Sequence, residues 1–214
     1  MSLVVAKLGG SLADSPQREA WLAALAASAR PLILVPGGGP FARAVRAAQA
    51  SMRFDDIAAH RLALLAMEQF GVVLAAHSDR YALASSRRDI EAAIEAGRIP
   101  VWLPSAMTLA APEIPASWDA TSDSLAAWLA GAFAARRLLL IKSCDLAGPV
   151  SLDRLAAANI VDPLFPRFAV RSGAVISVAG PASLPFAKAV FQSGETPGAR
   201  VTDEAIDASS LADS

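Results

Sequence analysis

The sequence has little of what several classes of protein require. Its 214 residues include one cysteine, Cys144, so an internal disulfide is excluded and a reducing cytoplasm is the expected location. The formal net charge is −1, which provides no overall field for attracting nucleic acid or an anionic membrane surface. The apolar stretch at 125–135 is too short to cross a bilayer, and no leader-like segment precedes the first apolar run. We therefore expect a cytoplasmic protein with no nucleic-acid or membrane partner.

Lysine is also scarce. Of the 19 basic residues only three are lysines, at positions 7, 142 and 188. Lys7 and Lys142 stand at the ends of apolar runs, where a chain that otherwise uses arginine has little reason to place a lysine. A compact ammonium group suits a single phosphoryl oxygen better than the wide guanidinium fork does. A lysine at a strand end can also extend its amine to solvent, so scarcity alone leaves a structural role open.

Strand-like and helix-like segments alternate along the chain. With 54% hydrophobic and 18% charged residues, the chain is expected to fold over most of its length. Short apolar runs predict strands at 3–8, 31–35, 101–103, 138–141 and 175–178, and helical patterns lie at 16–29, 40–50, 55–76, 87–96, 124–135, 163–172 and 184–192. Ser15 is a predicted helix cap, Gly71 a predicted bend and 105–120 a predicted loop. This alternation predicts an α/β fold whose mostly parallel sheet is covered by helices on both faces.

Two glycine-rich turns directly follow the first two predicted strands. They consist of Gly9, Gly10 and Ser11 and of Gly37, Gly38 and Gly39. Consecutive glycines let backbone N–H groups converge on an anion, and ligands of parallel sheets bind at the carboxyl ends of the strands. We expect the two turns to face each other across a phosphate-sized gap. Each turn alone is more simply a tight turn without a ligand, but the pair together with Lys7 favours phosphate binding.

Two further motifs lie in the second half of the chain. One consists of Thr121, Ser122 and Asp123 before an apolar helix, and the other of Lys142, Ser143 and Asp145 at the end of a strand. Ser122 or Asp123 could simply cap the helix. Alternatively, the carboxylate of Asp123 could orient the phosphate-binding lysines and keep them charged in a dry cleft.

In order and spacing these four motifs resemble the amino acid kinase superfamily, which includes acetylglutamate, aspartate, uridylate and isopentenyl phosphate kinases. The resemblance covers nearly the whole chain. It implies an α/β fold, a three-layer αβα sandwich with a mainly parallel central sheet. Residues 1–214 would form one domain, with an acceptor-binding half at about 1–120 and a nucleotide-binding half at about 121–205. A homo-oligomer is also expected, because superfamily members commonly assemble.

The resemblance also implies roles for the motif residues. Lys7, Asp123 and Lys142 would be catalytic, and Ser143 and Asp145 would border the ATP. The glycine turns, with amides near Gly10, Gly37 and Gly38, would hold the transferring phosphoryl group. Mg²⁺ would be carried by the ATP phosphates, with no protein metal site. The downstream Gly-Gly-Met-x-x-Lys segment of the superfamily is missing, and Lys188 does not replace it. The nucleotide specificity therefore stays open.

A narrower resemblance concerns the acceptor. Segments 60–63, 117–125 and 161–166 look like a branch of the superfamily that converts a phosphate monoester to a diphosphate. On this basis His60, Thr121 and Ser122 would bind a small-molecule phosphate, although His60 could equally be a surface or capping residue. His77 is expected to be structural. The resemblance implies that Asp162 approaches the nucleotide or the lysines, although it could equally cap the helix at 163. Alternative functions are a kinase for isopentenyl phosphate, a nucleotide or a carboxylate, and a non-catalytic protein that binds a nucleotide or an oxyanion.

Overall fold

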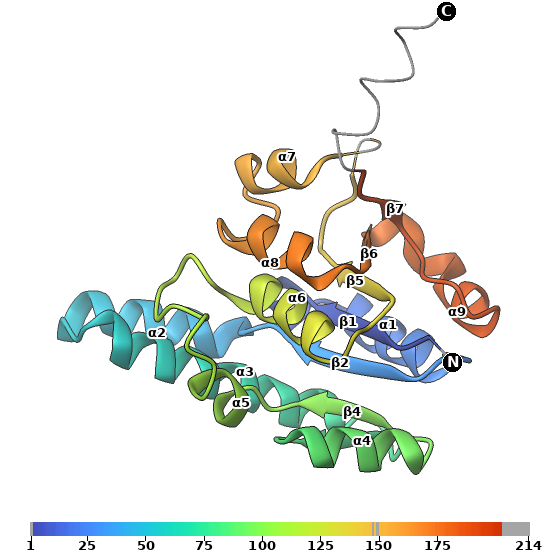
Figure 1. The fold of residues 1–214 in the computed structure, drawn as a ribbon, viewed down its shortest axis with the longest axis horizontal. Coiled ribbons are helices and arrows are strands. Elements are labelled where there is room, and N and C mark those ends of the chain that lie inside the picture. Colours follow the sequence, from blue (N-terminus) through green and yellow to red (C-terminus); the bar gives the residue numbers. More distant parts are fainter. Residues whose placement is uncertain (1, 147, 149, 203–214) are drawn as a thin grey trace, which may run out of the picture.

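A mostly parallel sheet runs through the middle of the molecule (Figure 1). The computed structural model describes residues 2–146, 148 and 150–202. The strands are β1 (Val4–Leu8), β2 (Leu32–Pro36), β3 (Tyr81–Ala84), β4 (Ile99–Trp102), β5 (Arg137–Ile141), β6 (Val175–Ala179) and β7 (Ala199–Arg200). Their order is β3-β4-β2-β1-β5-β6-β7, and β7 pairs antiparallel to β6 while the other pairs are parallel. This arrangement confirms the predicted α/β fold and its mainly parallel sheet.

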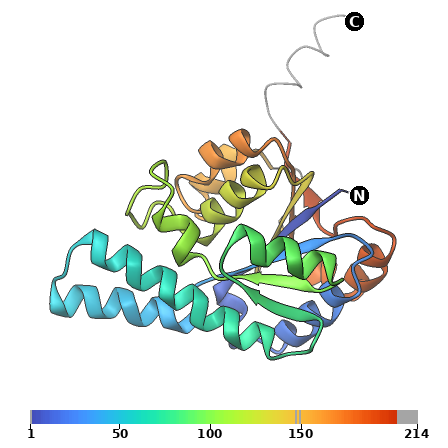
Figure 2. The ribbon, with the colours of Figure 1, turned by 60° about the horizontal axis from the view of Figure 1, so that its bottom comes forward.

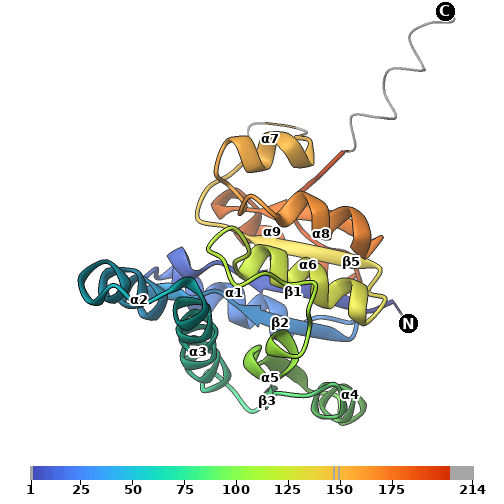
Figure 3. The same cartoon turned by 60° about the vertical axis from the view of Figure 1, so that its left-hand side comes forward.

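Helices cover both faces of the sheet. One face packs against α1 (Gln17–Ala26) and α9 (Leu184–Gln192), and the other against α4 (Arg87–Glu95), α6 (Ser122–Ala132), α7 (Leu152–Ala157) and α8 (Phe165–Ser172). Figure 3 shows α6 and α8 on the same side of the central strands. Each face has its own cluster of buried apolar side chains, so the molecule has the three predicted layers.

Alternation along the strands decides which face each lysine reaches. Val4, Ala6 and Leu8 of β1 pack with the α1 and α9 layer, and Val5 packs with the α6 layer. Because successive side chains point to opposite faces, Lys7 shares the face of Val5. On β5, Leu138 and Leu140 pack with the α6 layer, so the same period carries Lys142 to that face. Both lysines are therefore directed toward the helix that begins at Ser122.

Two long helices form a hairpin that projects from the sheet (Figures 1 and 2). They are α2 (Gly39–Met52) and α3 (Asp56–Ala75), and the left-handed backbone of Arg53 ends the first while Asp55 caps the second through the amide of Ala58. α3 is long and apolar enough by composition to cross a membrane. Its residues Phe70 and Leu74 are nevertheless buried against the sheet, as in the core helix of a globular domain.

Several predicted elements differ from the structure. Strands β3 and β7 and helix α7 were not predicted, and α5 (Ser105–Leu109) lies within the predicted loop. These elements are too short to produce a periodic pattern. α3 is continuous through Gly71, which instead permits close packing, since a Cβ there would lie 3.3 Å from Leu103. The first helix begins at Gln17 rather than Pro16, and the Ser15 hydroxyl accepts a hydrogen bond from the Gln17 amide.

Candidate functional site

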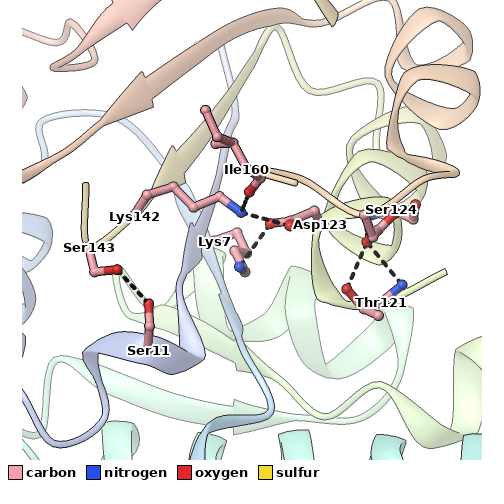
Figure 4. A network of polar contacts seen from close by, with 9 residues as sticks. Lys7, Ser11, Thr121, Asp123, Ser124, Lys142, Ser143 and Ile160 are labelled. Carbon is pink, nitrogen blue, oxygen red and sulfur yellow. Dashed lines mark hydrogen bonds and ion pairs between the residues drawn. The ribbon is translucent and has the colours of Figure 1, made fainter. Parts of the chain in front are cut away.

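A buried carboxylate lies between two buried lysines (Figure 4). The ammonium of Lys7 is 2.8 Å from Oδ1 of Asp123, and that of Lys142 is 2.7 Å from Oδ2. Lys142 also donates to the carbonyl of Ile160 at 2.6 Å. Lys7, Lys142 and Asp123 are 4%, 8% and 5% exposed as whole residues, so their charges interact in a dry environment. The cluster keeps a net positive charge, which suits an anionic ligand.

The environment changes the pKa values of Asp123 and Lys142. Burial opposes ionisation of Asp123, but the charges of Lys7 and Lys142 outweigh it and hold its pKa below the ordinary value. Burial and the neighbouring charge of Lys7 lower the pKa of Lys142 to about 8, although Asp123 and Asp162 counteract part of this effect. Asp123 is therefore ionised at neutral pH, while the charge on Lys142 is sensitive to mildly alkaline conditions.

The two glycine turns lie in direct backbone contact. A Cβ on Gly10 would lie 2.4 Å from the amide nitrogen of Gly39, and one on Gly37 would lie 2.3 Å from that of Gly10. The predicted phosphate-sized gap between the turns is therefore absent, because the glycines are used for this close approach. The amide of Gly37 donates to the carbonyl of Leu8, contrary to the expectation that it would donate to a phosphate. Gly38 and Gly39 stand at the start of α2, where helix geometry leaves amides without intrahelical partners.

The first glycine turn also meets the end of β5. The hydroxyl of Ser11 donates to that of Ser143 at 3.0 Å, and the amide of Gly9 donates to the carbonyl of Ile141. Asp145 is engaged elsewhere, since its carboxylate accepts the amide of Ala182 at 3.0 Å. The structure thus joins the first and fourth motifs directly and uses Asp145 to tie together the loops after β5 and β6.

Asp162 holds the start of α6. Its carboxylate accepts hydrogen bonds from the amide and hydroxyl of Thr121 and from the amide and hydroxyl of Ser124. The alternative in which it caps the helix at 163 is wrong, because α8 begins at Phe165 and has no side-chain cap. Capping by Asp162 leaves Asp123, in the first turn of the same helix, to pair with the lysines. Neither Ser122 nor Asp123 acts as the side-chain cap of α6.

A cavity of about 290 Å³ lies between the α2–α3 hairpin and the segment that leads into α6. Of the predicted site residues, it is lined by Gly10, Ser11, Gly38, Gly39, His60, Thr121 and Ser122. His60 is 9% exposed, and burial lowers its pKa, so the imidazole is neutral at neutral pH. The three predicted acceptor residues thus share one cavity, which adjoins the glycine turns.

Three residues that line this cavity, Arg43, Arg46 and Asp56, were not predicted from the sequence. Arg43 and Arg46 line it from α2, and the guanidinium of Arg46 lies 3.9 Å from the ring centroid of Trp118. Arg43 forms an exposed ion pair with Asp14 at 3.1 Å. The i, i+3 spacing of the two arginines, directly after a glycine turn, was the available signal. Because the chain has sixteen arginines, these two did not stand out in the sequence. Lys7 and Lys142 did, because lysine is scarce.

Comparison with known proteins identifies the family. Residues 2–145 match the model of the amino acid kinase family. The chain belongs to this family. The match spans more than half of the chain and includes the glycine turns and the lysine–aspartate cluster. The predicted family is therefore confirmed, and the match supports the prediction of an ATP-dependent phosphotransferase.

Individual relatives agree with this assignment. The chain is 28% identical over 143 residues to a [5-(aminomethyl)furan-3-yl]methyl phosphate kinase of Methanocaldococcus jannaschii, a match that covers 66% of each chain. It thus spans just under two-thirds of that relative's length. Among solved structures of the amino acid kinase fold, UMP kinase from Ureaplasma parvum has a TM-score of 0.70 at 14% identity, covering 94% of this chain and 99% of its own. Uridylate kinase from Archaeoglobus fulgidus has a TM-score of 0.66 at 18% identity, covering 94% and 100%.

Three carboxylates lie near the candidate site, and each could in principle bind Mg²⁺. Asp123 forms ion pairs with the two lysines, Asp162 accepts hydrogen bonds from the start of α6, and Asp145 accepts the amide of Ala182. Across residues 2–146, 148 and 150–202 no three His, Cys, Asp or Glu side chains gather in a metal-binding group. These contacts fit a metal that binds mainly through phosphate oxygens and water, the mode that Mg²⁺ commonly uses with nucleotides.

Proposed function

We propose that the protein transfers the γ-phosphoryl group of ATP to a small phosphate monoester and forms a diphosphate. The observation that carries this proposal is the buried Lys7–Asp123–Lys142 cluster beside the glycine turns and next to an arginine-lined cavity. An oxygen of the acceptor phosphate forms a bond to the γ-phosphorus. The bond from that phosphorus to the bridging oxygen breaks, and ADP leaves with the electron pair.

Each part of the site has a defined role in this proposal. Lys7 and Lys142 neutralise negative charge that builds up on the transferring group, and Asp123 keeps their ammonium groups in place. Amides at the start of α2, at Gly38 and Gly39, donate to phosphoryl oxygens with the support of the helix dipole. Bound with ATP, Mg²⁺ would supply further neutralisation of the phosphates.

The acceptor side of the proposal rests on the cavity. A phosphate monoester is already ionised, so it needs no strong general base, but its charge must be held. Arg43, Arg46 and the neutral His60 provide donors for that charge. The named relative supports [5-(aminomethyl)furan-3-yl]methyl phosphate as the acceptor. In this proposal the compound is an intermediate in the biosynthesis of methanofuran-type cofactors. The segments around His60, Ser117 and Asp162 support the same choice.

The proposal also covers the two halves of the chain, the location of the protein and its assembly. We propose that the half of the chain from about residue 1 to about residue 120 binds the acceptor, and that the half from about 121 to about 205 binds ATP, with Ser143 on the nucleotide side. Residues 203–205 of this range lie outside the described residues. We also propose a cytoplasmic homo-oligomer. The exposed apolar side chains of α3, among them Leu62, Leu65 and Val72, are compatible with an interface between copies.

An acceptor panel tests the proposed function. We expect Mg-ATP and the furan phosphate to give ADP and a furan diphosphate, measured by coupled ADP release and by phosphorus NMR. Isopentenyl phosphate, UMP and N-acetylglutamate should give much lower kcat/KM. If one of these three were phosphorylated and the furan phosphate were not, the assigned acceptor would be wrong, but the protein would still be a phosphotransferase. No ADP release with any acceptor would overturn the enzyme and favour a binding protein.

The activity should fall in mildly alkaline solution. The pKa of Lys142 is lowered from 10.5 to about 8, so its positive charge is present below about pH 8 and lost above it. In kcat/KM for ATP, which reports the free enzyme, we expect a decline centred near pH 8. In kcat the decline should move to higher pH, because bound phosphates favour the ammonium form. A kcat/KM profile that stays flat between about pH 7 and about pH 10 would contradict a role for the charged Lys142.

A further inference from the structure

One wall of the cavity is formed by α2, whose residues follow one another in a fixed order along it. Gly39, Arg43 and Arg46 line it successively, and Gln49 follows three residues later on the same side of the helix. At a rise of about 1.5 Å per residue, Gln49 lies about 15 Å along the axis from Gly39. The phosphate-binding glycine turn therefore stands at one end of this wall and Gln49 at the other, with the arginines between them.

Asp56 is fixed at the end of the cavity away from the glycine turns. It lines the cavity from the first turn of α3, and its Oδ1 accepts a hydrogen bond from Nε2 of Gln49 at 2.9 Å. The other end of the same amide, Oε1, accepts the indole N–H of Trp118 at 2.7 Å. Figures 1 and 2 show the segment between α5 and α6 arching toward the α2–α3 hairpin. The hydrogen bond to Gln49 places Trp118 of this segment at α2. The relay from Trp118 through Gln49 orients the carboxylate of Asp56.

No cation within residues 2–146, 148 and 150–202 forms an ion pair with this carboxylate. In the part of the chain that the structure describes, Asp56 forms no ion pair, because Arg43 pairs with Asp14 and Arg46 lies over the ring of Trp118. Helix capping does not explain Asp56 either, since the neighbouring Asp55 is the cap of α3. Among the cavity-lining residues, Asp56 is the one acidic residue. An oriented carboxylate without a cation, in a cavity that otherwise carries positive charge, fits a ligand with an anionic end and a cationic end.

We propose that Asp56 binds the primary ammonium group of the acceptor and selects for acceptors that carry one. This inference rests on the proposed function, because it concerns the same cavity. A furan ring that bears a phosphate arm and an aminomethyl arm needs its two charges held apart. The phosphate would lie toward the glycine turn and the arginines, the ring beside Trp118 and the ammonium at Asp56.

The test compares two acceptors that differ only in the amine. One is [5-(aminomethyl)furan-3-yl]methyl phosphate, and the other is the same phosphate with a methyl group in place of aminomethyl. The wild-type protein should prefer the first. Asp56→Asn should lower kcat/KM for the amine-bearing acceptor about ten- to a hundredfold, mainly through KM, and leave the methyl analogue unchanged. Asp56→Glu, which keeps the charge, should retain the preference for the amine.

Asp55→Asn is the matched control. It removes the same charge from the same helix start, and asparagine is as good a helix cap as aspartate, so both acceptors should behave as with the wild type. Thermal unfolding of each variant separates misfolding from altered binding. If Asp56→Asn affected both acceptors equally or neither, the inference would be overturned while the kinase proposal stood. If the wild type phosphorylated neither furan, the proposed function would fail and the assignment of Asp56 with it.

Discussion

Replacing Asp123 with asparagine is expected to abolish most of the activity and to destabilise the protein. The change preserves the shape of the side chain but leaves two buried ammonium groups without their shared anion. Removing one partner from a buried ion pair typically costs about 3–5 kcal/mol of unfolding free energy. The lysines would also lose their positions toward the transferring phosphoryl group, and we expect kcat to fall by at least about a hundredfold. Urea unfolding and steady-state kinetics measure the two effects.

The stability lost in Asp123→Asn should depend on pH in a direction that can be derived. In the wild type the folded pKa of Asp123 lies below the unfolded value, so its contribution is present above the unfolded pKa and disappears as the pH falls through the folded pKa. In the Asp123→Asn variant the pKa of Lys142 should drop further, because the carboxylate that raises it is gone. The unfolded chain then binds more protons than the folded one in alkaline solution, and part of the lost stability should return as the pH rises.

Asp119→Asn is the control for this variant. Asp119 is exposed in the segment before α6, so the same chemical change there should alter neither stability nor kcat. A variant at 123 with wild-type stability, and with a deficit that did not diminish toward alkaline pH, would show that the two lysines do not depend on this carboxylate.

Replacing Lys7 with methionine should reduce kcat about a hundred- to a thousandfold with a small change in stability. Lys7 is 4% exposed, and methionine fills a similar volume without burying a charge. The reaction loses a donor aimed at the transferring group, while Asp123 and Lys142 remain as a one-to-one pair. We expect the loss in kcat rather than in the KM for ATP, because the charge of Lys7 acts mostly on the transition state.

A second readout reports the contact between the lysines. The positive charge of Lys7 contributes to lowering the pKa of Lys142 to about 8, so its removal should raise that pKa. The alkaline decline of the residual activity should therefore move to higher pH in Lys7→Met. Lys188→Met is the matched control, since Lys188 is exposed on α9, away from the cluster. Full activity of Lys7→Met, or an alkaline decline at the wild-type pH, would refute the role assigned to this lysine.

Parts of the site were predictable because they follow from local periodicity. Glycine turns after apolar runs indicate the carboxyl edge of a parallel sheet, and a rare lysine beside such a turn indicates a phosphate. The period of two along β1 and β5 also places Lys7 and Lys142 on one face. By contrast, the expected gap between the glycine turns was wrong, because the sequence does not show that Gly10 and Gly37 are needed for backbone contact.

The sequence by itself determined the longer strands and helices, the positions of the glycine turns and the family, because these depend on residues close together in the chain. The tertiary structure alone decided which distant side chains meet. Gln49 and Trp118 are 69 residues apart, and Ser11 and Ser143 are 132 apart. Such contacts depend on how the α2–α3 hairpin and the loops pack, which no local pattern encodes. For that physical reason Arg43, Arg46 and Asp56 could be proposed as acceptor residues only from the folded molecule.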